Sequence, residues 1–208
     1  EMSKKYLGEQ IDIHAGGEDL IFPHHENEIA QSEAANGKEF SRYWMHNGFL
    51  NIDNRKMSKS LGNFFTVREI SEKYDLQVLR FFMLSAHYRS PLNFSAELME
   101  AAKSGLERII TAADRLKFLM GSAKTEDMAE TEAEKFAKSA EYVGNFESAM
   151  DDDFNTADAI AAVFDLVKFI NTMTDEDSSK EYLENLFDRL VRLTEVLGII
   201  VDKEDEIL

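Results

Sequence analysis

Long stretches of the second half carry apolar residues at helical spacing, and this pattern limits the fold more than any other feature. Such a stripe covers one side of a helix and is buried against partner helices. We therefore expect residues 95–208 to form an α-helical bundle, with the polar, acidic segment 121–131 linking two of its helices. The three stripes are Leu98, Ala102, Leu106, Ile109, Ala113, Leu116 and Met120; Met150, Phe154, Ala157, Ala161 and Phe164; and Leu183, Leu186, Leu190, Leu193, Leu197 and Ile200.

The first 65 residues show a different pattern. Residues 11–14 predict a short buried strand that ends at Gly16 and Gly17, and Pro23 then suits the first turn of a helix that runs to about residue 36. Residues 43–52 predict a second strand, and residues 53–63 a polar loop. Strand, glycine turn, helix and strand are typical of an α/β nucleotide-binding sheet.

Two helix starts carry the spacing of a capping box, in which a Ser or Thr and a Glu three residues later each bond the other's backbone amide. Thr66 and Glu69 form one such pair, and Ser178 and Glu181 form the other. We expect helices to begin at both places.

Composition excludes some classes of site. The chain contains no cysteine, which excludes disulfides and thiolate metal sites built from its own residues and fits a reducing cytosol. No apolar run reaches the roughly 18 residues of a membrane span, and no signal peptide opens the chain. We expect a cytoplasmic protein without a membrane partner, and a monomer.

Charge alone would argue against nucleic acid, because the net charge is −17 and phosphates attract Lys and Arg. The charge is unevenly distributed, however. Residues 1–93 hold 11 basic and 13 acidic residues, a net of −2, whereas residues 94–208 have a net of −15. A basic groove in the first half therefore remains open.

The most specific motif is Lys56-Met57-Ser58-Lys59-Ser60, followed by Leu61-Gly62-Asn63. Nucleotidyl transfer builds negative charge on the departing pyrophosphate, and lysines on a loop can close over that charge as it forms. An exposed basic turn is the alternative. The pentapeptide lies between an α/β pattern and a helical region, and this position favours catalytic roles for Lys56 and Lys59.

The pentapeptide resembles the KMSKS loop of class I aminoacyl-tRNA synthetases, and its surroundings resemble the cysteinyl-tRNA synthetases in particular. The resemblance covers nearly the whole chain in the family's order. The matching segments are DIHAGGEDL (12–20), FPHHENEIAQ (22–31), YWMHNG (43–48), SAHYRS (85–90) and MDDDFNT (150–156).

This resemblance implies a fold and its parts. The fold is the C-terminal part of a Rossmann-type class I catalytic domain followed by a helical bundle of the DALR type. Residues 1–65 would end the catalytic domain and carry the KMSKS loop. Residues 66–94 would form a helical linker that contacts the tRNA stem, and residues 95–208 the tRNA-binding helices.

The resemblance also implies a nucleotide site, in which His14, Gly16, Gly17, Asp19, His46 and Lys59 face ATP. Glycines let the backbone approach the nucleotide, and Asp19 can accept hydrogen bonds from a ribose hydroxyl. From the residues alone, His14 reads equally well as a packed core histidine and Gly-Gly-x-Asp as a simple turn. Trp44 fits the core as well as it fits a nucleotide site.

His24 and Glu28 stand four residues apart, so they share one side of a helix, and both residue types bind zinc. A solvated polar surface is the alternative. The resemblance implies that they are half of the family's zinc site, where two cysteines complete the set and the metal binds the substrate thiolate. This chain has neither cysteine, so we expect weak or absent zinc.

The function implied is part of a cysteine–tRNA ligase, which forms cysteinyl adenylate from cysteine and ATP and passes cysteine to tRNA(Cys). A related ligase that joins cysteine to an amino sugar is an alternative, and a non-catalytic helical scaffold is another. The HIGH sequence, the other half of the family's ATP site, is not in the chain, and the chain opens on an interior strand. We therefore expect a truncated piece that is inactive alone.

Overall fold

The computed structural model describes residues 2–52, 55–57 and 65–201, and its contacts divide the chain into two units. The strand unit contains residues 1–64 and 88–94. The helical unit contains residues 65–87 and 95–208. The expected linker, residues 66–94, is thus shared between the two, because its last seven residues return to the strand unit.

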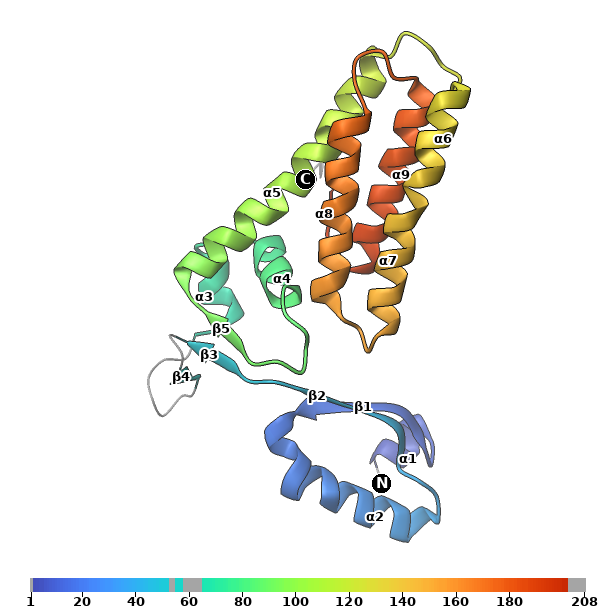
Figure 1. The fold of residues 1–208 in the computed structure, drawn as a ribbon. Helices are drawn as coiled ribbons and strands as arrows, with labels where there is room; N and C mark the ends of the chain where they lie inside the picture. Colours follow the sequence, from blue (N-terminus) through green and yellow to red (C-terminus); the bar gives the residue numbers. More distant parts are fainter. Residues whose placement is uncertain (1, 53–54, 58–64, 202–208) are drawn as a thin grey trace. The chain divides into compact units, whose positions relative to one another are not determined.

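The strand unit begins with α1 (Met2–Leu7) and then forms a β-α-β arrangement. Strand β1 (Ile11–Gly17) pairs in parallel with β2 (Ser41–Asn47), and α2 (Glu26–Asn36) connects them and runs beside them (Figure 1). Two short turns, η1 (Glu18–Leu20) and η2 (Ile21–His25), lead into α2. The regular helix therefore starts at Glu26 rather than at Pro23. It ends at Gly37, whose φ of 65° is the left-handed conformation that glycine adopts at helix ends.

A second sheet follows directly. Strand β3 (Leu50–Ile52) pairs antiparallel with β4 (Arg55–Lys56) and parallel with β5 (Leu92–Phe94). The single strand expected over residues 43–52 is therefore wrong, since β2 and β3 belong to different sheets. Gly48 separates them. A Cβ at this position would lie 2.6 Å from the backbone of Ser90, and the Gly48 amide donates to the Tyr88 carbonyl oxygen.

The described residues of the helical unit form helices that follow one another along the chain. These helices are α3 (Val67–Ser71), α4 (Leu76–Leu84), α5 (Ala96–Ser122), α6 (Glu130–Lys138), α7 (Ala140–Asp151), α8 (Thr156–Met173) and α9 (Lys180–Val196) (Figure 1). The expected bundle, and with it the predicted α/β plus α fold class, is confirmed. None of the helices in the described ranges has the length and apolarity needed to span a membrane.

The core of this unit lies between α5, α8 and α9, where two of the predicted stripes are buried. Ile109 and Leu116 of α5 and Leu183, Leu186 and Leu190 of α9 are inaccessible to solvent. The stripes are wrong at two ends, because Leu98 is 44% exposed and Ile200 is 51% exposed.

The middle stripe, residues 150–164, is wrong as a continuous helix. The chain turns between α7 and α8, and Asp153 and Phe154 adopt positive φ values of 54° and 56°. Phe154 is 51% exposed as a result. The buried side of α8 includes Leu166 and Ile170, which the predicted stripe does not reach.

The two predicted capping boxes have different outcomes. At α3, Thr66 and Glu69 bond each other's backbone amides as expected. At α9 the cap is Ser179 rather than Ser178, and its hydroxyl accepts from the Tyr182 amide.

Candidate functional site

The ends of the two parallel strands bring most of the predicted site residues together. The register of β1 and β2 sets His14 beside Trp44 and Gly16 beside His46. In α/β sheets the carboxyl ends of parallel strands are where ligands bind, because the connecting loops open there. The turn η2 and helix α2 then add side chains from FPHHENE to the same place.

Glu28 connects two of the histidines. Its Oε2 lies 2.8 Å from Nε2 of His14, and its Oε1 lies 3.7 Å from Nε2 of His24. His24 and Glu28 therefore do share one side of the helix start. The His24 side chain is 60% exposed, whereas those of His14 and Glu28 are largely covered.

His25 is the centre of the histidine cluster, and sequence analysis assigned it no role. It is 3% exposed, and its Nδ1 lies 2.8 Å from Nε2 of His46. The rings of His14 and Trp44 lie 5.0 and 5.1 Å from it, centroid to centroid. Two adjacent histidines in a sequence give no sign of which one is buried. The apolar neighbours that would reveal it, such as Trp44, come from another strand.

The surroundings of the His25 imidazole favour its neutral form. Burial lowers its pKa, and the positive charges that His14 and His46 can carry lower the pKa further, while Glu28 opposes the shift. A neutral His25 can donate one hydrogen bond and accept another, so it can orient His46 without adding charge to the site.

Gly16 and Gly17 leave space for neighbouring side chains at the end of β1. A Cβ on Gly16 would lie 2.9 Å from Cε1 of His25, which is too close for two carbon atoms. On Gly17 it would lie 2.5 Å from the Asp19 Oδ1 atom. Glycine at both positions therefore lets His25 and Asp19 approach the strand end.

The KMSKS segment is described only in part. Arg55 and Lys56 form β4, Lys56 is paired with Asn51, and the Met57 amide donates to the Leu50 carbonyl oxygen. The predicted catalytic residue Lys59 and the rest of the loop lie outside the described residues. The sheet thus fixes the backbone from which the motif begins.

The cluster offers ligand atoms of the kind that bind a transition metal. One atom each of His14, His25 and Glu28 lies within 4.8 Å of the others. Two imidazoles and a carboxylate are a donor set that zinc accepts. His24, which the sequence predicts as a metal ligand with Glu28, lies outside this set.

Comparison with known proteins shows what the chain is similar to. The cysteine–tRNA ligase of Lachnospira eligens is 64% identical over 207 residues, and that of Clostridioides difficile strain 630 is 55% identical over 207 residues. Both alignments cover 100% of this chain and 44% of the relative. The chain thus spans less than half the length of these enzymes.

Solved structures share the fold at low sequence identity. LeuRS of Agrobacterium radiobacter K84, in a ternary complex with tRNA and LeuAMS, matches 88% of this chain with a TM-score of 0.71 and 20% identity; the match covers 25% of the LeuRS chain. Methionyl-tRNA synthetase of Mycobacterium tuberculosis, bound by methionyl-adenylate, matches 90% of this chain and 41% of its own, with a TM-score of 0.66 and 20% identity.

Two family models match successive parts of the chain. Residues 1–104 match the tRNA synthetases class I (C) catalytic domain, and residues 145–201 match the DALR domain. The first covers the histidine cluster and the KMSKS segment, and the second covers most of α7 and all of α8 and α9. The chain therefore belongs to the cysteinyl-tRNA synthetase family of class I tRNA synthetases.

Proposed function

We propose that this chain forms the KMSKS-bearing and tRNA-facing part of a cysteine–tRNA ligase that works in the cytoplasm as a monomer. The observation that carries the proposal is the 64% identity with such an enzyme over 207 residues. In the proposed reaction, the cysteine carboxylate attacks the α-phosphate of ATP, and pyrophosphate leaves. The tRNA(Cys) 3′ end then takes cysteine from the adenylate and AMP is released.

The strand ends supply the nucleotide site in this proposal. Gly16 and Gly17 bring backbone close to the ligand, Asp19 accepts from the ribose, and His14 and His46 face the adenylate. The support is geometric, since the register places Gly16 beside His46 at the carboxyl ends of parallel strands. His25 positions His46 through their hydrogen bond.

Lys56 and Lys59 act on the leaving group. The β- and γ-phosphates gain charge as the bond to the α-phosphate breaks, and two ammonium groups stabilise that charge more in the transition state than in bound ATP. The pairing of β4 with β3 supports this role, because it anchors one end of the segment to a sheet of the same unit.

His24 and Glu28 are proposed as metal ligands for zinc. A bound zinc would supply a soft Lewis acid that prefers the thiolate of cysteine to the hydroxyl of serine. The imidazole and carboxylate groups of this cluster are of the types that bind zinc, but the chain has no thiolate of its own. We therefore propose that these residues hold zinc only weakly by themselves.

Activation of cysteine needs both halves of the ATP site, because the reaction depends on positioning both reactants. No HIGH sequence occurs in these 208 residues. We expect the isolated chain to show no measurable cysteine-dependent exchange of pyrophosphate into ATP.

A chimera tests the proposal directly. This chain replaces the matching 207-residue segment of the Lachnospira eligens enzyme, and charging of tRNA(Cys) with radiolabelled cysteine is measured. We expect charging within about tenfold of the parent enzyme, since 64% identity conserves most contacts. A chimera that folds but neither forms the adenylate nor charges tRNA would contradict the proposed function.

A further inference from the structure

The turn between α7 and α8 holds a backbone conformation that residues other than glycine rarely adopt. Asp153 and Phe154 follow one another with φ values of 54° and 56°, and no other non-glycine residue in the described ranges has a positive φ. A bulky residue such as Phe is strained in this left-handed region. Such residues persist only where the surrounding structure fixes them, and they cluster at functional sites.

Hydrogen bonds on both sides fix the shape of this turn. The Phe154 amide donates to the Met150 carbonyl oxygen at the end of α7. The Asn155 amide donates to the Ala149 carbonyl oxygen. The Asn155 side chain in turn accepts from the Asp158 amide and so caps α8. The turn is therefore bonded to the helix before it and to the helix after it.

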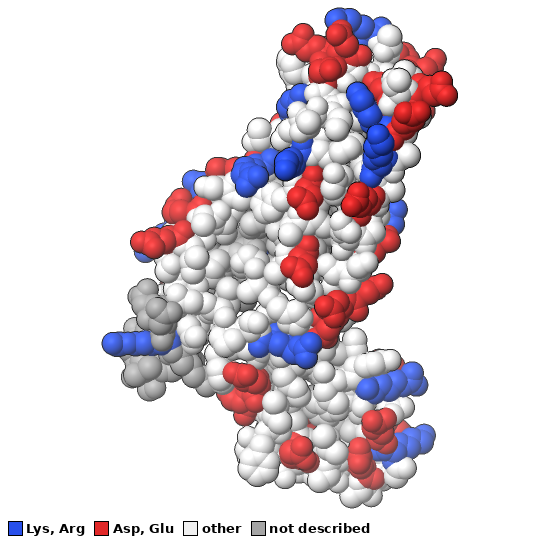
Figure 2. Space-filling view, viewed as in Figure 1, with Lys and Arg blue, Asp and Glu red and all other residues white. Residues whose placement is uncertain are grey.

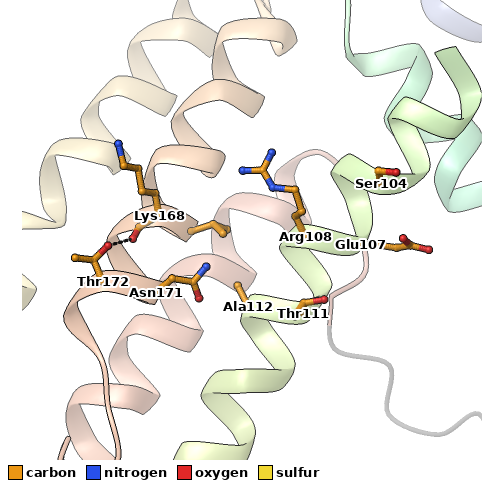
Figure 3. Close-up of a pocket in the computed structure, with 9 residues that line it drawn as sticks. Ser104, Glu107, Arg108, Thr111, Ala112, Lys168, Asn171 and Thr172 are labelled. Atoms are coloured by element: carbon orange, nitrogen blue, oxygen red, sulfur yellow. Dashed lines mark hydrogen bonds between the residues drawn. The ribbon is translucent and has the colours of Figure 1, made fainter. Parts of the chain in front are cut away.

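Helix α8 gives the turn a rigid support, because it packs against α5. Ile160 and Val163, about one and two turns after its start, are buried. Farther along, the Arg108 guanidinium carbon of α5 lies 4.8 Å from the centroid of the Phe164 ring. Figure 3 shows Arg108 and Lys168 on the two neighbouring helices, where they line a groove of 490 Å³.

The turn contacts the segment that follows α4. Nε2 of His87 lies 3.8 Å from Oδ2 of Asp153, within ion-pair distance, and the Thr156 hydroxyl donates to the Ala86 carbonyl oxygen at 3.4 Å. The side chains of His87 and Asp153 are 22% and 37% exposed, so salt screens this pair less than a fully exposed one. Together these two contacts are named the His87 clasp.

Charge favours the contact between His87 and Asp153. Asp153 directly follows Asp151 and Asp152, and residues 94–208 carry a net charge of −15. Figure 2 shows Asp and Glu side chains spread over the viewed face of the helical unit. A group that can carry positive charge is a favourable neighbour for such a carboxylate, because opposite charges attract and like charges repel.

The His87 clasp lies where the chain leaves the helical unit. Residues 88–94 belong to the strand unit, and the chain returns to the helical unit at Ser95. Ser95 is also fixed, because it caps α5 and its hydroxyl accepts from the Leu98 amide. The segment 88–94 is therefore held at both ends by residues of the helical unit.

Residues 88–94 complete the sheet from which the KMSKS segment begins. The Tyr88 carbonyl oxygen accepts from the Gly48 amide at 2.8 Å, and the Leu92 amide donates to the Phe49 carbonyl oxygen at 2.9 Å. Strand β5 pairs with β3, and β3 pairs with β4, where the motif begins. Strands of two and three residues are too short to be stable alone, so this sheet depends on how its ends are held.

We propose that His87 and Asp153 are positioning residues for the KMSKS segment. They fix the start of residues 88–94, so that β5 keeps β3 and β4 in the place from which the lysines act. The inference rests on the proposed function and goes beyond it, since it gives the α7–α8 turn a part in adenylate formation. Neither residue contacts the nucleotide.

Hydrogen exchange of the full 208-residue chain tests the positioning step without a need for activity. Asp153→Gly removes the carboxylate and keeps the turn, because glycine adopts a φ of 54° without strain. We expect the amides of Gly48 and Met57 to exchange about tenfold faster, since the sheet opens more easily. The amides of Ile11, in the other sheet, and Leu183, in α9, should change by less than about twofold.

Further variants separate the contact from its surroundings. His87→Ala should act as Asp153→Gly does, and the double variant should exchange no faster than either, since both changes break one contact. Asp153→Asn keeps an oxygen acceptor and tolerates the left-handed conformation, so it should recover part of the protection. Asp152→Asn is the matched control, because it removes the same charge from an exposed position one residue earlier and should leave exchange unchanged.

The chimeric enzyme tests the catalytic consequence. Asp153→Gly should lower the kcat of pyrophosphate exchange about tenfold and change the KM for ATP by less than about twofold, because the lysines act chiefly in the transition state. The burst of adenylate counts the active sites, so a general loss of stability would lower the count and leave kcat per site unchanged. Asp153→Asn should restore part of the rate, and Asp152→Asn should match the unaltered chimera.

Each contrary result has its own meaning. Unchanged exchange at Gly48 and Met57 in Asp153→Gly would overturn the inference while the proposed function stands. An equal acceleration at Leu183 would overturn it too, since the clasp would then stabilise the fold as a whole. A faster-exchanging sheet with unchanged kcat per site would remove the catalytic role. An unaltered chimera that forms no adenylate would overturn the proposed function, and the catalytic role with it.

Discussion

Glu132 of α6 accepts two hydrogen bonds from Ser179, the residue that caps α9. Its Oε1 accepts from the Ser179 amide at 2.9 Å, and its Oε2 accepts from the Ser179 hydroxyl at 2.7 Å. A helix start normally satisfies its first amides with local side chains. Here Ser179 caps α9 locally, and its own amide and hydroxyl donate to a carboxylate 47 residues away, which fixes the start of α9 against α6.

Removing this carboxylate should destabilise the helical unit. Glu132→Gln loses an ionic acceptor of buried donors and is expected to lower the free energy of unfolding by about 1–3 kcal/mol. Ser179→Ala should cost about 1 kcal/mol through loss of the cap. The double variant should cost less than the sum, since both changes break the same contact. Urea unfolding followed by circular dichroism measures all three, and exposed Glu134→Gln on the same helix should stay within about 0.5 kcal/mol.

The same carboxylate predicts a pH dependence. Burial alone would raise the pKa of Glu132, but hydrogen bonds from Ser179 and Ala129 outweigh it and hold the pKa below its ordinary value of 4.5. The folded state therefore binds this proton less readily than the unfolded state. The stabilisation is complete above pH 4.5 and is lost as the pH falls through the lowered, folded-state pKa. Unfolding at a series of pH values should show this loss in the unaltered chain and a shallower one in Glu132→Gln; equal slopes would refute it.

A methyl group at Gly16 should disturb the histidine cluster. In Gly16→Ala the new carbon would meet the buried His25 ring at 2.9 Å, so either the ring or the strand must move. We expect a loss of about 1–3 kcal/mol in the stability of the strand unit. The imidazole signals of His25 and His46 should shift together in NMR spectra. Gly144→Ala is the control, since no atom lies within 4 Å of its added carbon, and it should be neutral or slightly stabilising.

Measuring zinc binding by variants of the chain distinguishes the predicted ligands, His24 and Glu28, from the neighbouring histidines. We expect zinc added to the metal-free chain to be lost on desalting with a weak chelator, because a structural zinc site takes four protein ligands and the chain has no thiolate. Glu28→Gln should abolish the weak zinc binding measured by titration.

His24→Ala is the more informative variant, since His24 lies outside the close set of His14, His25 and Glu28. Binding that survives His24→Ala would move the metal onto that set, and one zinc retained per chain would contradict the prediction of weak binding. His87→Gln, in the helical unit, is the control.

The sequence predicts those parts of the fold that depend on interactions between residues close together in the chain. The Thr66 capping box, the glycine stop at Gly37 and the apolar sides of α5 and α9 depend on residues a few positions apart, and all three are present. The α/β pattern and the helical bundle follow from the same short periods.

The predictions are wrong where the structure depends on contacts between residues that lie far apart in the sequence. Position 48, between β2 and β3, has no room for a side chain because the backbone of Ser90 lies against it, and Ser179, which caps α9, donates to Glu132. The burial of His25 likewise depends on Trp44 and His46 from the neighbouring strand. Each of these partners is too far away in the sequence to be part of a local hydrophobic pattern.

The proposed roles of Lys56 and Lys59 predict that the chimeric enzyme loses activity when either lysine is replaced. In the proposed mechanism, replacing either lysine by Ala removes a cation that stabilises the departing pyrophosphate in the transition state. We expect the rate of pyrophosphate exchange to fall about 100-fold or more, with a smaller change in the KM for ATP, since a contact made chiefly in the transition state affects kcat rather than binding. Lys5→Ala, an exposed change in α1, controls for the loss of a positive charge. A fall in affinity for ATP at unchanged kcat would show that the lysines hold the substrate rather than stabilise the leaving group. Unchanged kinetics in both variants would remove them from the catalytic site altogether.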